Sequence, residues 1–340
     1  MNAASSRVAC SICIANFNGE AILDACLASV FSQGLGEDIE VIVHDDASAD
    51  DSLSVLARYP AVQVLQSASN VGFCESNNRM VAAARGEFIL LLNNDAALEP
   101  DALSALLRKS RDLGAPAVLT LPQRDWETGV LVDRGCLLDP FMNPVPNLDA
   151  QREHVAMVIG ACLWMPRSLW NQLGGFPAWI GSIAEDMYVC CAARQLGYAV
   201  LCLPTPGYRH MQGKSFGGNR VDSGRLTTTY RRRQLSERNK SSLLVIFTPS
   251  PWLAPALTLH VATLTLEGLF LALFRRDRRL WRDVYHAALR HLWDQRTSLI
   301  ALRRAQQTRR TLGARSYYAA FTWWPRKLVM LFRYGLPRLR

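Results

Sequence analysis

The sequence lacks the features that mark secreted or metal-stapled proteins. Its N-terminus, MNAASSRVACSICIANFN, has no charged segment followed by a long apolar one, so no secretory signal is evident. Its nine cysteines show no C-x-x-C spacing and occur singly or as the adjacent pair Cys190 and Cys191. This pattern argues against disulfides and a zinc site. It predicts buried apolar cysteines in a reducing compartment, with the N-terminal part of the chain in the cytosol.

Extreme composition is absent as well. Of the 340 residues, 49% are apolar, 20% charged and 9% aromatic. These values are typical of globular proteins and exclude a disordered chain, a collagen or a disulfide scaffold. At roughly 150 residues per domain, the length predicts about two compact units and excludes a peptide-sized binding module. There is no internal repeat.

The net charge of +9 is unevenly distributed along the chain. Residues 231–340 contain 22 Lys and Arg against 5 Asp and Glu, whereas residues 1–230 contain 16 against 24. An acidic N-terminal part is therefore joined to a strongly basic C-terminal part. The basic part predicts an anionic partner, either a membrane surface or a nucleic acid.

Short apolar runs alternate with segments of helical periodicity in the N-terminal part. Strands are predicted at 8–14, 39–44, 62–65 and 87–92, and helices at 21–31, 52–58 and 77–85. This alternation predicts a parallel, doubly wound α/β sheet. The run EFILLL shows no alternation, as expected of a strand buried on both faces.

Polar residues follow two of these strands directly. Asp45 and Asp46 come after the strand at 39–44, and Asn93-Asn94-Asp95 after the strand at 87–92. Because ligands bind beyond the carboxyl ends of parallel strands, these residues are predicted to meet a ligand. Further along, residues 120–155 predict irregular loops with a hairpin, and 155–165 predict a strand. A helix is then predicted with Glu185 and Asp186 in its first turn, where the exposed amides favour carboxylates.

The basic C-terminal part contains a long apolar stretch from Ser241 to Phe274. Three prolines break it, and His260 and Glu267 interrupt the 18 residues 257–274, so an interfacial or re-entrant helix is predicted rather than a spanning one. Arginine clusters alternate with tryptophans after it, which fits the headgroup region of an anionic membrane. A solvated basic face is the alternative for the arginines of RRRQLSERNK.

Six segments in order resemble the family 2 glycosyltransferases of the GT-A fold, especially bacterial rhamnosyltransferase-like members: ICIANFNG, VIVHDDASADDS, NVGFCESNN, LLLNNDA, EDMYVCCAARQLGY and GYRH. The resemblance covers residues 8–240. It implies a Rossmann-like, mostly parallel sheet flanked by helices in a catalytic domain at 1–240. A basic, apolar helical region at 241–340 would then associate with the membrane.

The resemblance also implies a nucleotide-sugar site. Asp46 would contact the base, and the backbone near Ala15 would lie across its ring. Asp50 and Asp51 are expected to cap the local loop and helix instead. The residues assigned to the nucleotide sugar are Ala15, Asn16, Asp45, Asp46, Asn70, Gly72, Phe73, Asn77, Asn93 and Asn94.

For the metal and the chemistry, the resemblance places Asn93-Asn94-Asp95 at the family's D-x-D motif. Asp95 would contact Mg²⁺ or Mn²⁺ on the diphosphate, with His210 as a further ligand. The family motif has Asp where this chain has Asn93, so one carboxylate and the diphosphate would share the cation. Asp186 is implied as the base that deprotonates the acceptor hydroxyl, and Glu185 as an orienting or capping group.

The function predicted from these residues is an inverting, metal-dependent transfer of a sugar to a hydroxyl. The donor would be a dTDP- or UDP-sugar, with rhamnose favoured, and the acceptor a lipid-linked or polysaccharide glycan such as that of lipopolysaccharide. The protein is expected on the cytoplasmic face of the inner membrane, peripheral or re-entrant. The loop 213–218 is expected as a lid, and Arg231–Arg233, Arg238 and Lys240 to hold diphosphate or lipid headgroups.

Two other functions are compatible with parts of the sequence. A sugar-nucleotide nucleotidyltransferase uses a similar sheet, but it needs a Gly-rich basic loop after the first strand, where ANFNG has one Gly and no Lys or Arg. A nucleic-acid-binding protein would explain the basic C-terminal part. Its tryptophans lie among long apolar stretches instead of forming a stacking strip, so lipid is favoured and no nucleic acid is expected as a partner.

Overall fold

The computed structural model describes residues 8–34, 39–211, 220–222, 225–336 and 338–339. The chain divides into two compact units. Unit 1 comprises Met1–Cys136, Pro146–Ala193 and Tyr198–Met211, and unit 2 comprises Leu137–Val145, Arg194–Gly197 and Gln212–Arg340. The domain boundary predicted at 240/241 falls inside helix α7 (Tyr230–Phe247), so a cut there would divide a continuous helix of unit 2.

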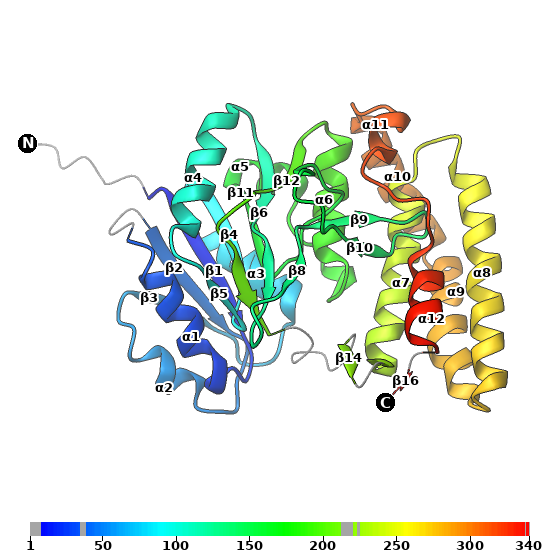
Figure 1. Cartoon of the computed structure of the whole chain (residues 1–340), viewed down its shortest axis with the longest axis horizontal. Coiled ribbons are helices and arrows are strands. Elements are labelled where there is room, and N and C mark those ends of the chain that lie inside the picture. The colour runs from blue at the N-terminus through cyan, green and yellow to red at the C-terminus, as the bar shows by residue number, and fades with distance from the viewer. Residues whose placement is uncertain (1–7, 35–38, 212–219, 223–224, 337, 340) are drawn as a thin grey trace, which may run out of the picture. The chain divides into compact units, whose positions relative to one another are not determined.

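A seven-stranded sheet in the order β12-β6-β11-β4-β1-β2-β3 forms the centre of unit 1 (Figure 1). Its strands are β1 (Cys10–Asn16), β2 (Ile39–Asp45), β3 (Val62–Gln66), β4 (Phe88–Asn93), β6 (Ala117–Thr120), β11 (Cys162–Pro166) and β12 (Ala199–Cys202). Only β11 runs antiparallel to its neighbours among these strands. The predicted mostly parallel α/β sheet is therefore confirmed.

Helices cover both faces of this sheet. They are α1 (Glu20–Phe31), α2 (Ser52–Leu56), α3 (Phe73–Ala83), α4 (Ala102–Leu113), α5 (Arg167–Leu173), the 3₁₀ turn η2 (Ala178–Ile180) and α6 (Glu185–Gln195). Alternate residues of β1, such as Ile12 and Ile14, pack in one apolar cluster with Leu23 and Leu27 of α1. The helix α3 contacts β1 and β2 without joining that cluster, so it covers the opposite face. Burial on both faces explains the uninterrupted apolar run of β4.

A smaller sheet supplies further polar residues to unit 1. It has the order β5-β13-β7-β8 and consists of β5 (Ala96–Leu98), β13 (Tyr208–His210), β7 (Gln123–Asp125) and β8 (Leu131–Asp133). The strands β9 (Cys136–Leu138) and β10 (Pro144–Pro146) pair separately. The stretch 120–155, predicted as loops with a hairpin, thus contains four short strands.

Two predicted elements differ from those observed. The helix predicted from Asn77 begins four residues earlier, at Phe73, directly after Gly72, whose φ of +87° turns the chain into the helix. The strand predicted over 155–165 forms only from Cys162, because the preceding residues make isolated bridges instead of a ladder. All nine cysteines are buried, as predicted.

Unit 2 consists mainly of helices. They are α7, α8 (Leu253–Phe274), the π-helical η3 (Leu280–His286), α9 (Ala287–Asp294), α10 (Arg296–Arg309), α11 (Ala314–Tyr318) and α12 (Arg326–Tyr334). Three short strands accompany them: β14 (Arg220–Asp222), β15 (Arg225–Thr228) and β16 (Arg338–Leu339). A small apolar core joins Leu264 and Leu271 of α8 to Val284 and Tyr285 of η3. The predicted helical C-terminal region is confirmed.

Candidate active site

Side-chain hydrogen bonds tie together the carboxyl ends of β1, β2 and β4. The Asn16 amide nitrogen donates to Asp45 Oδ1 over 3.0 Å, and the Asn94 amide nitrogen donates to Asn16 Oδ1 over 2.8 Å. Asp45 also accepts from the hydroxyl of Ser48. These three predicted nucleotide-site residues therefore lie together, and they fix the ends of three parallel strands in one polar group.

Gly19 makes the contact between Asn16 and Asn94 possible. A Cβ atom at residue 19 would lie 2.1 Å from Asn16 Oδ1 and 2.5 Å from Asn94 Nδ2. Any side chain there would displace the amide pair. The glycine of the ANFNG segment is therefore explained by the close approach of backbone to these side chains.

Asp46 lies beside this group and holds the turn before α3. Its two carboxylate oxygens accept hydrogen bonds from the backbone N–H groups of Val71 and Gly72, over 2.7 and 2.8 Å. Asn70 contacts the backbone oxygen of Asp46 over 3.5 Å. The carboxylate that was assigned to the nucleotide base thus also shapes the N-V-G turn.

Of the two acids expected to cap local structure, Asp50 and Asp51, only Asp50 makes cap bonds through its side chain. One oxygen of Asp50 accepts from the backbone N–H of Glu20 at the start of α1, and the other from that of Ser52 at the start of α2. Asp51 occupies the position before α2 without a side-chain cap bond. Asp50 therefore joins the first turns of two helices.

The remaining predicted nucleotide-site residues line the same edge of the sheet or start α3. Ala15 lies between His44 and Asn93 in the register of β1 with its two neighbours. Phe73 stacks on Phe176, with ring centroids 6.1 Å apart. Asn77 is buried and donates to the backbone oxygen of Phe73, so its amide serves the first turn of α3.

The two predicted metal ligands lie next to each other. His210 Nε2 is 3.1 Å from Asp95 Oδ1, and both residues are buried. Asn93 Nδ2 lies 3.5 Å from the same imidazole nitrogen. The amide oxygen of Asn93 is buried and has no hydrogen-bond partner in the described part of the chain. A carboxylate and an imidazole thus meet here, and the Asn93 side chain lies beside the imidazole.

Gln123 contacts His210 and orients it, and no motif in the sequence points to this residue. Its side-chain oxygen lies 3.3 Å from His210 Nδ1 and accepts from the Tyr208 hydroxyl over 2.8 Å. Because this oxygen can only accept, Nδ1 carries a proton, and Nε2 is the nitrogen turned toward Asp95. A lone pair facing a carboxylate at 3.1 Å requires a cation or a proton between them.

These donors fit a divalent cation of the Mg²⁺ or Mn²⁺ type, which takes oxygen and imidazole ligands. The described residues contain no cluster of three or more His, Cys, Asp or Glu side chains able to hold a metal by themselves. A cation here would therefore need ligands beyond Asp95 and His210, which the Asn93 oxygen and a diphosphate can supply.

Asp186 is linked to this edge of the sheet by a short backbone path. Its Oδ2 accepts from the N–H of Gly160 over 3.0 Å, and the oxygen of the next residue, Ala161, accepts from the N–H of Asn93 over 3.1 Å. Its Oδ1 accepts from the N–H of Met187 over 2.7 Å. Asp186 thus lies near the end of β4 at Asn93. Asp95 follows two residues later in the chain.

Cys74 of α3 lies within electrostatic range of Glu185 and Asp186. Burial raises the pKa of its thiol, and the negative charges of Glu185 and Asp186 raise it further. Glu185 is itself buried at the start of α6. Both acids therefore lie close to the start of α3, beside the predicted nucleotide-site turn.

The sequence also predicts a lid over the site and basic side chains that bind diphosphate or lipid headgroups. The predicted lid at 213–218 lies outside the described residues. Arg233, which is partly buried, and Lys240, which is buried, were predicted to hold diphosphate or headgroups, but they pair with Glu237 and Glu267 in an ion network of unit 2. Those two side chains are thus committed within unit 2.

Comparisons with known proteins match the part of the chain that contains most of these residues. Residues 11–174 match the family model described as Glycosyl transferase family 2. Chondroitin synthase from Escherichia coli is 30% identical over 185 residues, which are 53% of this chain and 26% of that protein. The O-antigen chain rhamnosyltransferase WbaN from Salmonella anatum is 25% identical over 189 residues, 53% of this chain and 59% of that protein. The chain thus spans between about a quarter and three fifths of the length of these relatives.

The fold has counterparts among solved structures. A crystal structure of GalNAc-T7 with UDP, GalNAc and Mn²⁺ matches with a TM-score of 0.58 over 86% of this chain and 58% of that chain, at 14% identity. At this identity the likeness concerns the fold alone. Since the family match includes the Asn16, Asp45 and Asp95 edge of the sheet, it favours the glycosyltransferase interpretation over a nucleotidyltransferase. Residues 11–174 therefore carry the sequence pattern of the family 2 glycosyltransferases, on a fold similar to that of GT-A glycosyltransferases.

Proposed function

We propose that the protein is an inverting glycosyltransferase that moves a sugar from a nucleoside diphosphate to an acceptor hydroxyl. The observation that carries this proposal is the meeting of two carboxylates at one edge of the sheet: Asp95 beside His210, and Asp186 joined to Asn93 through Gly160 and Ala161. The cation-binding group and the base are then available to opposite ends of one reacting sugar.

Each step of the transfer has a group in the chain. Asp186 takes the proton of the acceptor hydroxyl as its oxygen bonds to the anomeric carbon. The bond from that carbon to the diphosphate oxygen breaks, and its electron pair leaves with the nucleoside diphosphate. A divalent cation held by Asp95, His210 and the Asn93 oxygen would neutralise the leaving diphosphate. Attack opposite the leaving group inverts the anomeric configuration.

Within the site, Gln123 is a positioning residue. By accepting from Nδ1–H of His210, it keeps the Nε2 lone pair directed at the cation position. The polar group formed by Asn16, Asp45 and Asn94 fixes the three strand ends against which the nucleotide would bind.

The finer assignments concern donor, acceptor and location. Rhamnose from a dTDP-sugar is the favoured donor group, which the rhamnosyltransferase relative supports, and a UDP-sugar is the alternative that the UDP-bound neighbour supports. The acceptor is a lipid-linked or polysaccharide glycan of the cell surface. The proposed location is the cytoplasmic face of the inner membrane, supported by the basic, apolar unit 2.

The test is release of nucleoside diphosphate from a series of nucleotide sugars in the presence of Mn²⁺ or Mg²⁺. We expect turnover with one donor class, dTDP-rhamnose first, and loss of that turnover in Asp186→Asn. Absence of release from every nucleotide sugar, with the wild-type protein folded and the metal present, would contradict the proposal.

A further inference from the structure

Helix α8 is the one described helix that is long and apolar enough to cross a membrane, judged by length and composition. Only 22% of its most apolar stretch is buried. One face of the helix is exposed and carries large apolar side chains: Leu259, Leu266, Leu269, Phe270 and Leu273. We call this set the outer face of α8. Leu273 is 78% exposed, so the outer face is far from any core packing.

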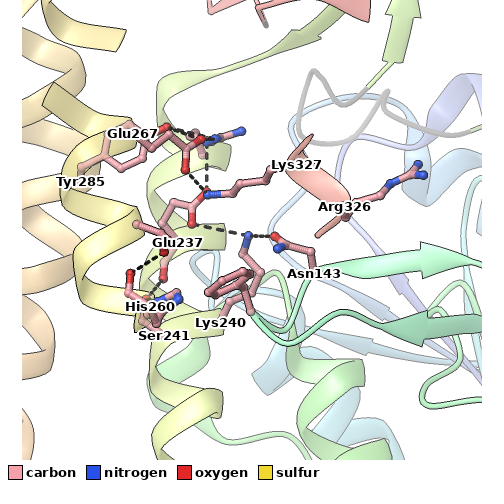
Figure 2. A network of polar contacts seen from close by, with 12 residues as sticks. Asn143, Glu237, Lys240, Ser241, His260, Glu267, Tyr285, Arg326 and Lys327 are labelled. Atoms are coloured by element: carbon pink, nitrogen blue, oxygen red, sulfur yellow. Dashed lines mark hydrogen bonds and ion pairs between the residues drawn. The ribbon is translucent and has the colours of Figure 1, made fainter. Parts of the chain in front are cut away.

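Two polar residues of α8, His260 and Glu267, lie on the side of the helix that contacts α7 and are bound inside unit 2. His260 and Glu267 are seven residues apart, which places them on the same side of a helix. His260 Nε2 is 2.7 Å from the Ser241 hydroxyl of α7, and Glu267 pairs with Arg233 of α7 over 2.5 Å (Figure 2). The helix is therefore two-sided, with its polar contacts directed into unit 2.

An ion network extends from these contacts through unit 2. Lys327 of α12 bridges Glu267 and Glu237, over 2.6 and 2.8 Å (Figure 2). Lys240 lies 3.5 Å from Glu237 and donates to the Asn143 side chain. Burial alone would raise the pKa of Glu237, but the surrounding cations, Lys240 first, lower it below its usual range. The network therefore holds charged groups beside the part of α8 between His260 and Glu267.

A spanning α8 would carry this network into the bilayer. The 22-residue helix is about 33 Å long, which matches the hydrocarbon thickness, so Glu267 and its partners from α7 and α12 would lie within the apolar region. Charged side chains at that depth are strongly unfavourable. If α8 instead lies parallel to the surface, only the outer face enters the lipid and the network stays on the protein side.

Cationic residues flank the outer face at the C-terminal end of α8. Arg275, Arg276, Arg278 and Arg279 are exposed, with one acid, Asp277, among them. The hydroxyl of Tyr230 donates to Asp277, which directs that acid back toward α7. Trp252, 55% exposed, precedes the helix at its other end. An apolar strip with adjacent arginines and an interfacial tryptophan is complementary to anionic lipid.

We propose that unit 2 docks on an anionic lipid bilayer through the outer face of α8, with the helix axis parallel to the membrane surface. The inference deepens the proposed membrane location and uses no residue of the candidate active site. Its occupant is the bilayer and not a second copy or a protein partner.

The depth of labelled α8 residues in the bilayer distinguishes a helix that lies on the membrane from one that crosses it. The variants Leu259→Cys, Leu266→Cys and Leu273→Cys each carry one fluorophore on the outer face, since all nine native cysteines are buried. The vesicles contain phosphatidylethanolamine and phosphatidylglycerol at 3:1, with a spin label high or low on the acyl chain. A flat helix predicts equal, shallow quenching at the three positions, although they span about 21 Å of helix.

Two outcomes of this experiment would overturn the proposal. Deepest quenching at position 266 with shallow quenching at 259 and 273 means that α8 crosses the bilayer. Absence of quenching at all three positions, or protection of the labels by self-association without vesicles, means that the outer face does not meet lipid.

Vesicle flotation tests the two parts of the surface separately. Leu266→Glu with Phe270→Glu should abolish flotation with the same vesicles, whereas Leu148→Glu, an exposed leucine of unit 1, should leave it unchanged. Arg278→Gln with Arg279→Gln should weaken binding roughly fivefold for each arginine removed, and less at high salt. Equal flotation of the wild type and the outer-face variant would overturn the proposal.

Release of nucleoside diphosphate from soluble donor, measured on the same samples, separates this inference from the proposed function. Normal release with no lipid binding contradicts the docking surface alone. Lipid binding with no release from any donor contradicts the catalytic proposal alone.

Discussion

Asp186 accepts two backbone hydrogen bonds, from Gly160 and Met187, and both stabilise its charged form. The two bonds hold the carboxylate in one orientation, as the proposed base requires. Asp186→Asn keeps the shape and the acceptor oxygen but removes the basicity. We expect kcat to fall about 10²- to 10⁴-fold with nearly unchanged affinity for the nucleotide, measured by turnover and by nucleotide titration.

Asp101→Asn is a matched control for this variant. Asp101 is exposed, precedes α4 and has a left-handed φ of 64° that asparagine adopts easily. Its turnover should equal that of the wild type. Normal turnover in Asp186→Asn would show that another group accepts the proton.

Gln123 offers a prediction about metal affinity that is separate from turnover. Gln123→Met keeps the volume but removes the oxygen that accepts from His210 Nδ1. The imidazole then loses its fixed tautomer, so Mn²⁺ affinity in the presence of nucleoside diphosphate should fall about 10- to 100-fold, measured by electron paramagnetic resonance.

Tyr208→Phe is the control for Gln123, because it removes the other donor to the same oxygen and leaves the histidine contact in place. Its Mn²⁺ affinity should match that of the wild type. Equal losses in both variants would assign the effect to packing of the small sheet instead of histidine orientation.

At the scale of elements, α8 is joined to α7 by a buried histidine. Burial lowers the pKa of His260 to about 4, against about 6.5 in an unfolded chain. Between pH 6.5 and pH 4, His260 is protonated in the unfolded chain and neutral in the folded chain. The free energy of unfolding therefore falls as the pH falls from 6.5 toward 4. The contribution is at most about 3 kcal/mol.

His260→Gln should remove this contribution to the loss of stability at acidic pH. The glutamine side chain keeps an N–H donor for Ser241. Urea unfolding at pH 7 and pH 5 measures the difference: the wild type should lose more stability than the variant between the two values. An equal loss in both proteins would mean that His260 titrates normally in the folded state.

Lys327 links helix α12 to Glu237 and Glu267. Lys327→Met removes a partner from both Glu237 and Glu267 and leaves buried negative charge with fewer counter-charges. We expect the free energy of unfolding to fall by about 1–3 kcal/mol, less than for a fully buried pair because Lys327 and Glu267 are partly exposed.

Arg282→Met provides the comparison, since the pair of Arg282 with Asp283 is exposed. It should leave the free energy of unfolding unchanged in the same denaturant titration. Equal effects of the two substitutions would contradict the importance of the ion network.

For the whole molecule, ligand binding and stability are coupled through the site at Asp95. Nucleoside diphosphate and Mn²⁺ added together should raise the melting temperature by several degrees, since a ligand at 100 times its Kd adds about 2.7 kcal/mol. EDTA, or the substitution Asp95→Ala, should abolish the part of the shift that depends on metal. A nucleotide-dependent shift that is the same with and without EDTA would remove the metal from the proposed function.

The sequence predicts the main sheet and the polar edge well, because both depend on local patterns. Alternating apolar runs and helices define β1 to β4, and the acids that follow them necessarily lie at one edge of a parallel sheet. The partnership of Gln123 with His210 is not local. It arises where β7 and β13, 85 residues apart along the chain at the Tyr208–Gln123 contact, become neighbours in the small sheet.

The reversal of β11 and the ion network of unit 2 also depend on tertiary structure. Single polar interruptions in an apolar stretch, such as His260 and Glu267, give no sign of their partners in α7 and α12. Basic residues of α7 therefore looked available for ligands, whereas Arg233 and Lys240 serve to neutralise buried acids.

The composition of unit 2 from three separate chain segments has a consequence for how such a protein can be dissected. The segment Leu137–Val145 belongs to unit 2 although the chain before and after it belongs to unit 1. In this segment the Asn143 side chain accepts a hydrogen bond from Lys240, and Asp139 accepts one from the backbone N–H of Arg326. No single proteolytic cut, and no single stop codon, yields an intact unit 1 free of unit 2 sequence. A gene fusion or domain exchange would therefore have to include the coding sequence of both units together.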